Sequence, residues 1–155
     1  MTALLARLQG DQVGARKAQD KPLTLLLGTL LSELKYREIE LQRDLTDPDV
    51  VEVLRKAIKR RREAAEMFDK GARADLSAIE KTECAAIEKY LPAAPPDDEI
   101  RSAVRAAIAA GAANVGAVMG KVMPQFKGRA EGGQINAMAR EELAKSAAPP
   151  SAPPA

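Results

Sequence analysis

Basic side chains are concentrated in a run that could contact a phosphate backbone. Residues 55–62 read RKAIKRRR and hold six basic residues in eight, with no acid. At about 100° per residue, Arg55, Lys59 and Arg62 share one stripe of a helix. Such a ridge suits phosphate contact, so these three are candidate RNA-binding residues. The alternative is a solvated face that nearby acids partly neutralise (Glu52, Glu63 and Glu66).

A second basic zone lies in the C-terminal part of the chain. No acid occurs between Glu99 and Glu131, and a glycine-rich stretch near its end reads KGRAEGG. A flexible loop of this kind lets backbone N–H groups and cations approach phosphates together. In the alternative interpretation the loop only joins two helices, and its arginine caps a carbonyl. As RNA-backbone contacts we expect Lys127 and Arg129 of the loop, supported by Lys121 and Arg140.

The composition limits the kind of nucleic acid that could bind. The net charge is only +2, and four side chains are aromatic: Tyr36, Phe68, Tyr90 and Phe126. We expect the first three in core or seam positions, so stacking of single-stranded bases is disfavoured. Recognition of structured RNA through its backbone and shape fits this surface better.

Catalytic chemistry finds little support in the residue types. Histidine is absent, and the single cysteine, Cys84, therefore has no imidazole to activate it. We expect Cys84 to pack as a small apolar residue. The glycines do not form a Walker loop or a dinucleotide fingerprint, and no spacing suggests a metal site. We therefore expect no catalytic residue, no metal and no cofactor.

The elements that carry these residues should all be helices. Alanine, leucine, glutamate, lysine and arginine dominate, and no strand-like alternation is present. Residues 1–91 predict a helical hairpin or bundle of about four helices, and residues 98–146 a small three-helix domain. Between them, the proline-rich residues 92–97 are expected to form a linker. Residues 147–155, with four prolines, are expected to be a disordered tail.

Capping residues place the helix starts. Thr2, Asp20 and Thr46 or Asp47 should cap the first three helices, which would end near residues 18, 42 and 70. Asp75 should cap the fourth helix. In the second domain we expect helices over 99–110, 115–123 and 134–145, the first two capped by Asp97 or Asp98 and by Asn114.

An ion pair should join the third and fourth helices. Arg61 falls in the middle of an otherwise apolar stripe, and so does Glu83. If the two helices form a hairpin that turns near Ala72, these residues face each other. We predict a partly buried Arg61–Glu83 pair that sets the register of the hairpin rather than doing chemistry.

Membrane and secretion signals are missing. No apolar run approaches the roughly 18 residues of a membrane span, and the first residues have no signal-peptide core. A cytoplasmic protein without a membrane partner is the expectation, and the sequence leaves the oligomeric state open.

The C-terminal motif resembles that of a known family. Residues 116–136 read GAVMGKVMPQFKGRAEGGQIN and are similar to the GatB/YqeY pattern, as are KRRREAAEMFDKGARADL (59–76) and EKYLP (88–92). The resemblance covers about residues 3–145. Two positions depart from the pattern: Ala117 replaces a lysine, whose contact Lys121 one turn along could supply, and Glu131 replaces an aspartate.

The resemblance implies a helical N-terminal domain and a C-terminal domain similar to the tail of the B subunit of the tRNA-dependent amidotransferase, which contacts tRNA. It implies a non-catalytic, tRNA-binding accessory module, with aminoacyl-tRNA synthetases or amidotransferase subunits as partners. The family label, a carbon-nitrogen ligase with glutamine as amido-N-donor, implies an amidotransferase component as the alternative, although the subunit's catalytic part has no counterpart here. A helical protein-interaction module is the second alternative.

Overall fold

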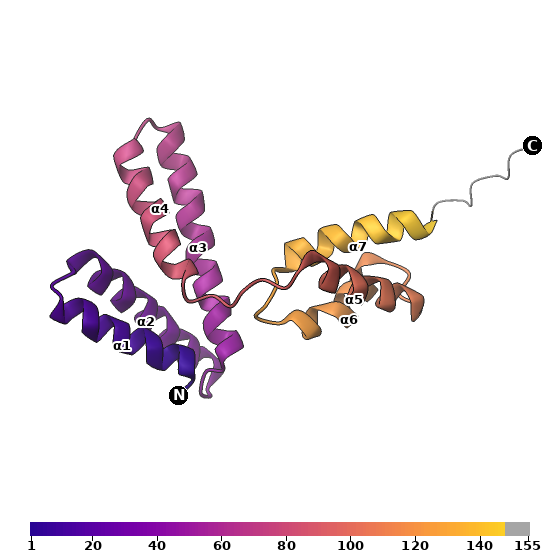
Figure 1. The fold of residues 1–155 in the computed structure, drawn as a ribbon, viewed down its shortest axis with the longest axis horizontal. Coiled ribbons are helices and arrows are strands. Elements are labelled where there is room, and N and C mark those ends of the chain that lie inside the picture. The colour runs from indigo at the N-terminus through magenta and orange to yellow at the C-terminus, as the bar shows by residue number, and fades with distance from the viewer. Residues whose placement is uncertain (148–155) are drawn as a thin grey trace, which may run out of the picture. The chain divides into compact units, whose positions relative to one another are not determined.

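The computed structural model describes residues 1–147, and the all-α class predicted from the sequence is confirmed over this range. Within these residues, seven α-helices and one short 3-10 helix form two compact units, which divide between Pro92 and Ala93 (Figure 1). The tail expected over 147–155 lies outside the described residues, except Ala147, which ends the last helix.

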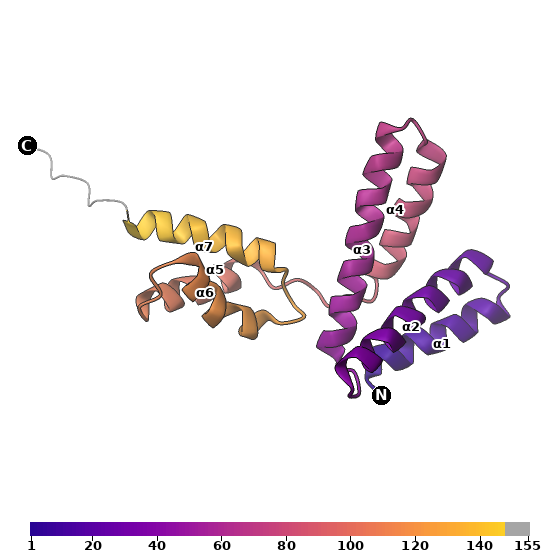
Figure 2. The same ribbon diagram turned by 180° about the vertical axis from the view of Figure 1, so that it is seen from behind.

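The first unit consists of two helical hairpins. Helices α1 (Ala3–Lys17) and α2 (Lys21–Leu41) form one, and α3 (Asp47–Lys70) and α4 (Ala74–Glu88) form the other. The predicted N-caps Thr2, Asp20 and Thr46 are confirmed; each side chain accepts a hydrogen bond from a backbone N–H in the first turn. The hairpins meet at the start of α3 and diverge toward their turns (Figures 1 and 2).

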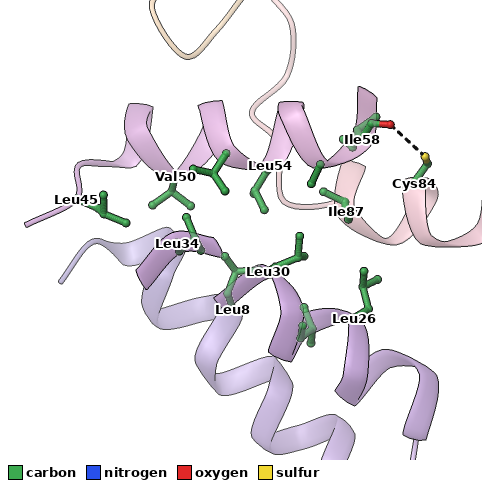
Figure 3. Packing of buried hydrophobic residues seen from close by; sticks show 13 residues of the cluster. Leu8, Leu26, Leu30, Leu34, Leu45, Val50, Leu54, Ile58, Cys84 and Ile87 are labelled. Carbon is green, nitrogen blue, oxygen red and sulfur yellow. Dashed lines mark hydrogen bonds between the residues drawn. The ribbon is translucent and has the colours of Figure 1, made fainter. Parts of the chain in front are cut away.

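The core of this unit is built mainly from leucine. Leu8, Leu27, Leu30 and Leu54 are fully buried together with Val50, and Cys84 and Ile87 complete the cluster from α4 (Figure 3). Because the side chains of α1, α2 and α3 meet here, the cluster holds the two hairpins together by excluding apolar surface from water. The Cys84 thiol donates a 3.6 Å hydrogen bond to the Ile58 carbonyl, and burial raises the pKa of this thiol. The cysteine is therefore part of the core.

The prediction that Asp75 caps α4 was wrong. The N-cap is Arg73, and α4 begins at Ala74. The turn is closed by Ala72 in the left-handed region (φ 55°) and by a 2.8 Å hydrogen bond from Arg73 N–H to Phe68 O. This geometry starts the helix earlier and leaves Asp75 inside the first turn. There its carboxylate still favours the positive end of the helix dipole and accepts hydrogen bonds from Arg73.

The second unit packs three helices around its own core. These are α5 (Asp97–Ala109), α6 (Val115–Val122) and α7 (Gly132–Ala147), with the 3-10 helix η1 (Met123–Phe126) directly after α6. Asn114 caps α6 as predicted. The cap predicted at Asp97 or Asp98 was wrong, because Pro96 is the N-cap and both aspartates lie in the first turn. The core gathers the buried side chains of all four elements, among them Ile100, Val104, Val118, Val122, Phe126 and Ile135.

Candidate nucleic-acid interface

The stretch between η1 and α7 is a closed turn. The N–H groups of Arg129 and Ala130 both donate to Phe126 O, at 2.8 and 3.1 Å, and Gly128 takes the left-handed conformation (φ 77°) that the reversal requires. Gly132 and Gly133, expected in a flexible loop, belong to the first turn of α7. The helix starts two residues earlier than predicted, so the connection is shorter and presents its side chains from a defined backbone.

Arg129 is paired with an acid of α5. Its Nη2 atom lies 3.1 and 3.2 Å from the two carboxylate oxygens of Glu99, and its guanidinium lies 5.6 Å from the centre of the Phe126 ring. It therefore connects the turn to α5 through a carboxylate, whereas the alternative interpretation expected a carbonyl. Its positive charge is largely compensated, although its side chain remains 47% exposed.

Three of the predicted contacts carry positive charge without an acidic partner. Lys121, Lys127 and Arg140 are all exposed, and within residues 1–147 none of them forms an ion pair. Lys121 Nζ lies 3.5 Å from Ala110 O, and Arg140 Nε donates to Asn136 Oδ1 at 2.8 Å. Neutral partners of this kind leave the charges available to an anion. The three residues come from α6, the turn and α7 of one unit.

Two other cations of the acid-free stretch are neutralised from α7. Arg101 Nη1 and Arg105 Nε lie 2.7 and 2.9 Å from the carboxylate of Glu142, which is only 6% exposed. Hydrogen bonds from Arg105 and then Arg101 lower the pKa of Glu142 to about 2. Glu142 lies 37 and 41 residues from its partners, so an acid count along the local sequence missed it.

The basic run of α3 is also neutralised largely by neighbouring helices. Arg60 pairs with Glu33 of α2 at 2.6 Å and Arg62 with Glu88 of α4 at 2.7 Å. Of the flanking acids expected to neutralise the run, Glu52 pairs with Lys56 at 2.8 Å. Of the predicted contacts on this helix, Lys59 is exposed and has no acidic partner among the described residues, whereas Arg55 is partly buried. Among the described residues, three cations of the run, Arg60, Arg61 and Arg62, are therefore paired with acids of other helices.

The Arg61–Glu83 pair is present. Arg61 Nε donates to Glu83 Oε2 at 2.8 Å, and Arg61 Nη1 donates to Ala57 O at 3.1 Å. The side chains are 13% and 33% exposed, so the pair is partly buried between α3 and α4.

Two further observations concern other kinds of site. Across the part of the chain that the structure describes, no group of three or more His, Cys, Asp and Glu side chains could hold a metal ion. No helix in that range is long and apolar enough to cross a membrane.

Comparison with known proteins identifies the family. The family model described as Yqey-like protein matches residues 5–143. A protein of Schizosaccharomyces pombe (strain 972 / ATCC 24843), named "Uncharacterized protein C22F3.15", is 33% identical over 89 residues, which cover 57% of this chain and 72% of the relative. The chain belongs to the YqeY-like family, as the motifs around Lys127 indicated.

Proposed function

We propose that this YqeY-like chain is an accessory module that binds tRNA through its basic helical surfaces, with no catalysis of its own, in connection with tRNA-dependent amidation or aminoacylation. One observation carries the proposal. Lys121, Lys127 and Arg140 remain exposed and without an acidic partner within residues 1–147, while Arg101, Arg105 and Arg129 of the same unit are paired with acids.

The physical reason lies in the exchange of partners that binding requires. An unpaired surface cation that meets a phosphate releases counterions, and this release contributes most of the non-specific affinity for nucleic acids. A cation already paired with a carboxylate must first give up that partner, so its net contribution is smaller. Lys121, Lys127 and Arg140 are therefore the contacts we expect to matter most, with Lys59 as the corresponding residue of α3.

The test compares two triple variants with the same loss of charge. The first replaces Lys121, Lys127 and Arg140 by glutamine. The control replaces three exposed cations by glutamine, each of which is paired with an acid. These are Lys35, Arg73 and Lys81, whose partners are Glu38, Asp75 and Asp69. In fluorescence anisotropy with total tRNA, we expect the first variant to bind more weakly and to lose about 0.7–0.9 from the salt slope for each contact removed. We expect the control to change far less.

Equal behaviour of the two triple variants would contradict the proposal, because binding would then follow net charge alone. Circular dichroism of each variant serves as the control for folding. The alternative of an amidotransferase component requires glutamine-dependent turnover with tRNA and ATP, alone or with partner subunits. Turnover in that assay would replace the non-catalytic proposal.

A protein-interaction role has one structural observation in its favour. Leu25, Tyr36 and Ile39 of α2 are 74%, 74% and 61% exposed, so the expectation that Tyr36 occupies a core or seam position was wrong. The other leucines of the first hairpin point inward: Leu8 is fully buried, and Leu31 packs against the core. A salt-insensitive protein complex that contains no RNA and is lost on Tyr36→Ser would favour this role.

A further inference from the structure

The turn between α1 and α2 carries cations that the basic motifs do not include. Arg16 and Lys17 lie in the last turn of α1, and Lys21 begins α2. All three are exposed, and none forms an ion pair with any residue of the range 1–147. Part of the uncompensated positive charge of the first unit therefore lies at this turn. In the denser basic run of α3, residues 55–62, most cations form ion pairs with acids.

A wide groove of about 970 Å³ begins at this turn and follows the two helices. Among the described residues that line it, Arg16 and Lys21 are the charged ones, and Gln12 and Gln19 add side-chain amides. In Figures 1 and 2 the two helices run side by side up to their turn. The groove thus combines cations and amide donors with no carboxylate.

The acids near this groove are not among the residues that line it. Asp11 accepts a 2.6 Å hydrogen bond from the Tyr90 hydroxyl, which ties α1 to the end of α4. Asp20 accepts from Leu23 N–H at 3.1 Å and lines a different groove, between α2 and α4. Glu33 pairs with Arg60. The charges among the described lining residues are therefore positive, and Asp20 adjoins the groove beside Lys21.

The α2 side of the groove is built from small residues. Thr24, Thr29 and Ser32 donate their hydroxyl hydrogens to carbonyls one turn earlier, at 2.7, 3.1 and 3.0 Å, so they do not project as free donors. At Gly28 a Cβ atom would lie 3.0 Å from Gln12 Nε2, so the Gln12 amide of α1 lies close to the glycine of α2. The Gln12 amide thus adds a donor to this side of the groove, beside the cations Arg16 and Lys21.

We propose that this groove binds the phosphate backbone of an RNA and gives the first unit its own contact with the nucleic acid. The proposal rests on the proposed function and adds a second site to it. Charge complementarity favours RNA over a protein partner, because Arg16 and Lys21, the charged residues of the described lining, are both cationic. Leu25 is the one large apolar side chain of that lining. A phosphodiester chain supplies the acceptors that guanidinium, ammonium and amide groups can bind.

The experiment uses the full chain and total tRNA. The variant Arg16→Gln with Lys21→Gln is compared with Lys35→Gln with Lys81→Gln, whose lysines are exposed but paired with Glu38 and Asp69. We expect the first pair to weaken binding and to lower the salt slope by about 1.4–1.8, which corresponds to two phosphate contacts. We expect a far smaller change from the control pair.

A second variant probes the groove without removing a cation. Leu25 is 74% exposed, so Leu25→Glu places a carboxylate in the groove with little effect on folding. We expect it to weaken tRNA binding, and Leu25→Gln to weaken it much less.

The outcomes separate this inference from the proposed function. If the groove variants bind like wild type while Lys121, Lys127 and Arg140 matter, the groove proposal is overturned and the proposed function stands. If the wild type does not bind tRNA at low salt, both fail. Loss of a salt-insensitive protein complex on Leu25→Glu, with unchanged tRNA affinity, would assign the groove to a protein and also overturn the proposal.

Discussion

Arg61 of α3 and Glu83 of α4 are joined by a 2.8 Å hydrogen bond at a point where both helices otherwise present apolar side chains. The Arg61 guanidinium also donates to Ala57 O one turn earlier. Because separating the pair would leave the 13% exposed Arg61 without its carboxylate partner, we expect it to favour one register of the hairpin over sliding of the two helices. Arg60 and Arg62 of the surrounding run are likewise paired with acids of neighbouring helices.

Removal of one partner of this pair should destabilise the hairpin. Glu83→Ala leaves the mostly buried Arg61 unpaired, and we expect a cost of about 1.5–3 kcal/mol in the free energy of unfolding. Glu83→Gln keeps an acceptor and should cost less. A double-mutant cycle with Arg61→Met, measured by urea denaturation, gives the coupling free energy. A coupling of zero would show that the two side chains do not interact in solution.

The α3–α4 turn carries a conformational strain that one substitution should relieve. Ala72 has φ 55°, whereas the adjacent Gly71 has φ −85°. A left-handed conformation costs a residue with a Cβ atom about 1–2 kcal/mol, and the larger entropy of the unfolded glycine takes back about 0.4–1 kcal/mol. Ala72→Gly should therefore raise stability by roughly 0.5–1 kcal/mol. Thermal unfolding measures this change, and a lower melting temperature would refute the assignment.

Gly71 provides the control at the same turn. A Cβ atom there would lie 3.4 Å from Met67 O, which is close to an ordinary contact. Because φ at Gly71 suits alanine, Gly71→Ala should not lower stability and should raise it by about 0.4–1 kcal/mol through the smaller entropy of the unfolded chain, although glycine is the residue expected to end a helix. A large loss of stability at Gly71 would place the left-handed residue one position earlier.

Acid should destabilise the second unit through Glu142. Arg105 and Arg101 hold the pKa of Glu142 at about 2, below the usual 4.5. A depressed carboxyl pKa contributes stability above the unfolded pKa, and that contribution is lost as the pH falls through about 4.5 toward 2. We expect the urea midpoint to decline across this window in wild type and to decline less in Glu142→Gln.

The first unit should respond to acid for the same reason. Hydrogen bonds from Arg43, and from Thr46 as well, hold the pKa of buried Asp49 well below its usual range. Asp49→Asn should therefore lower stability near neutral pH and flatten the acid response of the first unit. The exposed Glu141→Gln, which changes a surface partner of Arg101, is the control for both experiments. An acid response that is identical in all variants would contradict both assignments.

Within the KGRAE turn, we expect the cation without an acidic partner to contribute more to the affinity for RNA than the cation that is paired with a carboxylate. Lys127 has no acidic partner among the described residues, and Arg129 is held by Glu99. We expect Lys127→Gln to lower the salt slope of tRNA binding by about 0.7–0.9 and Arg129→Gln to lower it less, while Arg129→Gln should cost more stability. The reverse order in binding would show that the Arg129–Glu99 pair opens to receive a phosphate.

Helix starts were predictable where a side chain makes a cap hydrogen bond. Thr2, Asp20, Thr46 and Asn114 all do so. The sequence misled at Asp75 and at Asp97 or Asp98, because an acid in the first turn benefits from the helix dipole as much as an acid at the cap does. The start of α4 depends instead on the left-handed backbone of Ala72. An alanine gives no indication in the sequence of that conformation.

The charged surface was predictable only in part, because compensation depends on tertiary neighbours. The Arg61–Glu83 partnership followed from helical period and hairpin symmetry. In contrast, other arginines pair with acids that lie on different helices and far away in the sequence. These acids are Glu33, Glu88 and Glu142. The sequence therefore overstated the free charge of the α3 run and did not single out Arg16 and Lys21 of the α1–α2 groove.

The most direct test of tRNA binding is the salt dependence of wild-type affinity for total tRNA, measured by anisotropy between about 50 and 200 mM salt. We predict binding at the lower concentration that weakens steeply toward the higher one, with a slope that falls when Lys121, Lys127 and Arg140 are replaced by glutamine. No binding at low salt, or binding that salt does not weaken, would contradict the account.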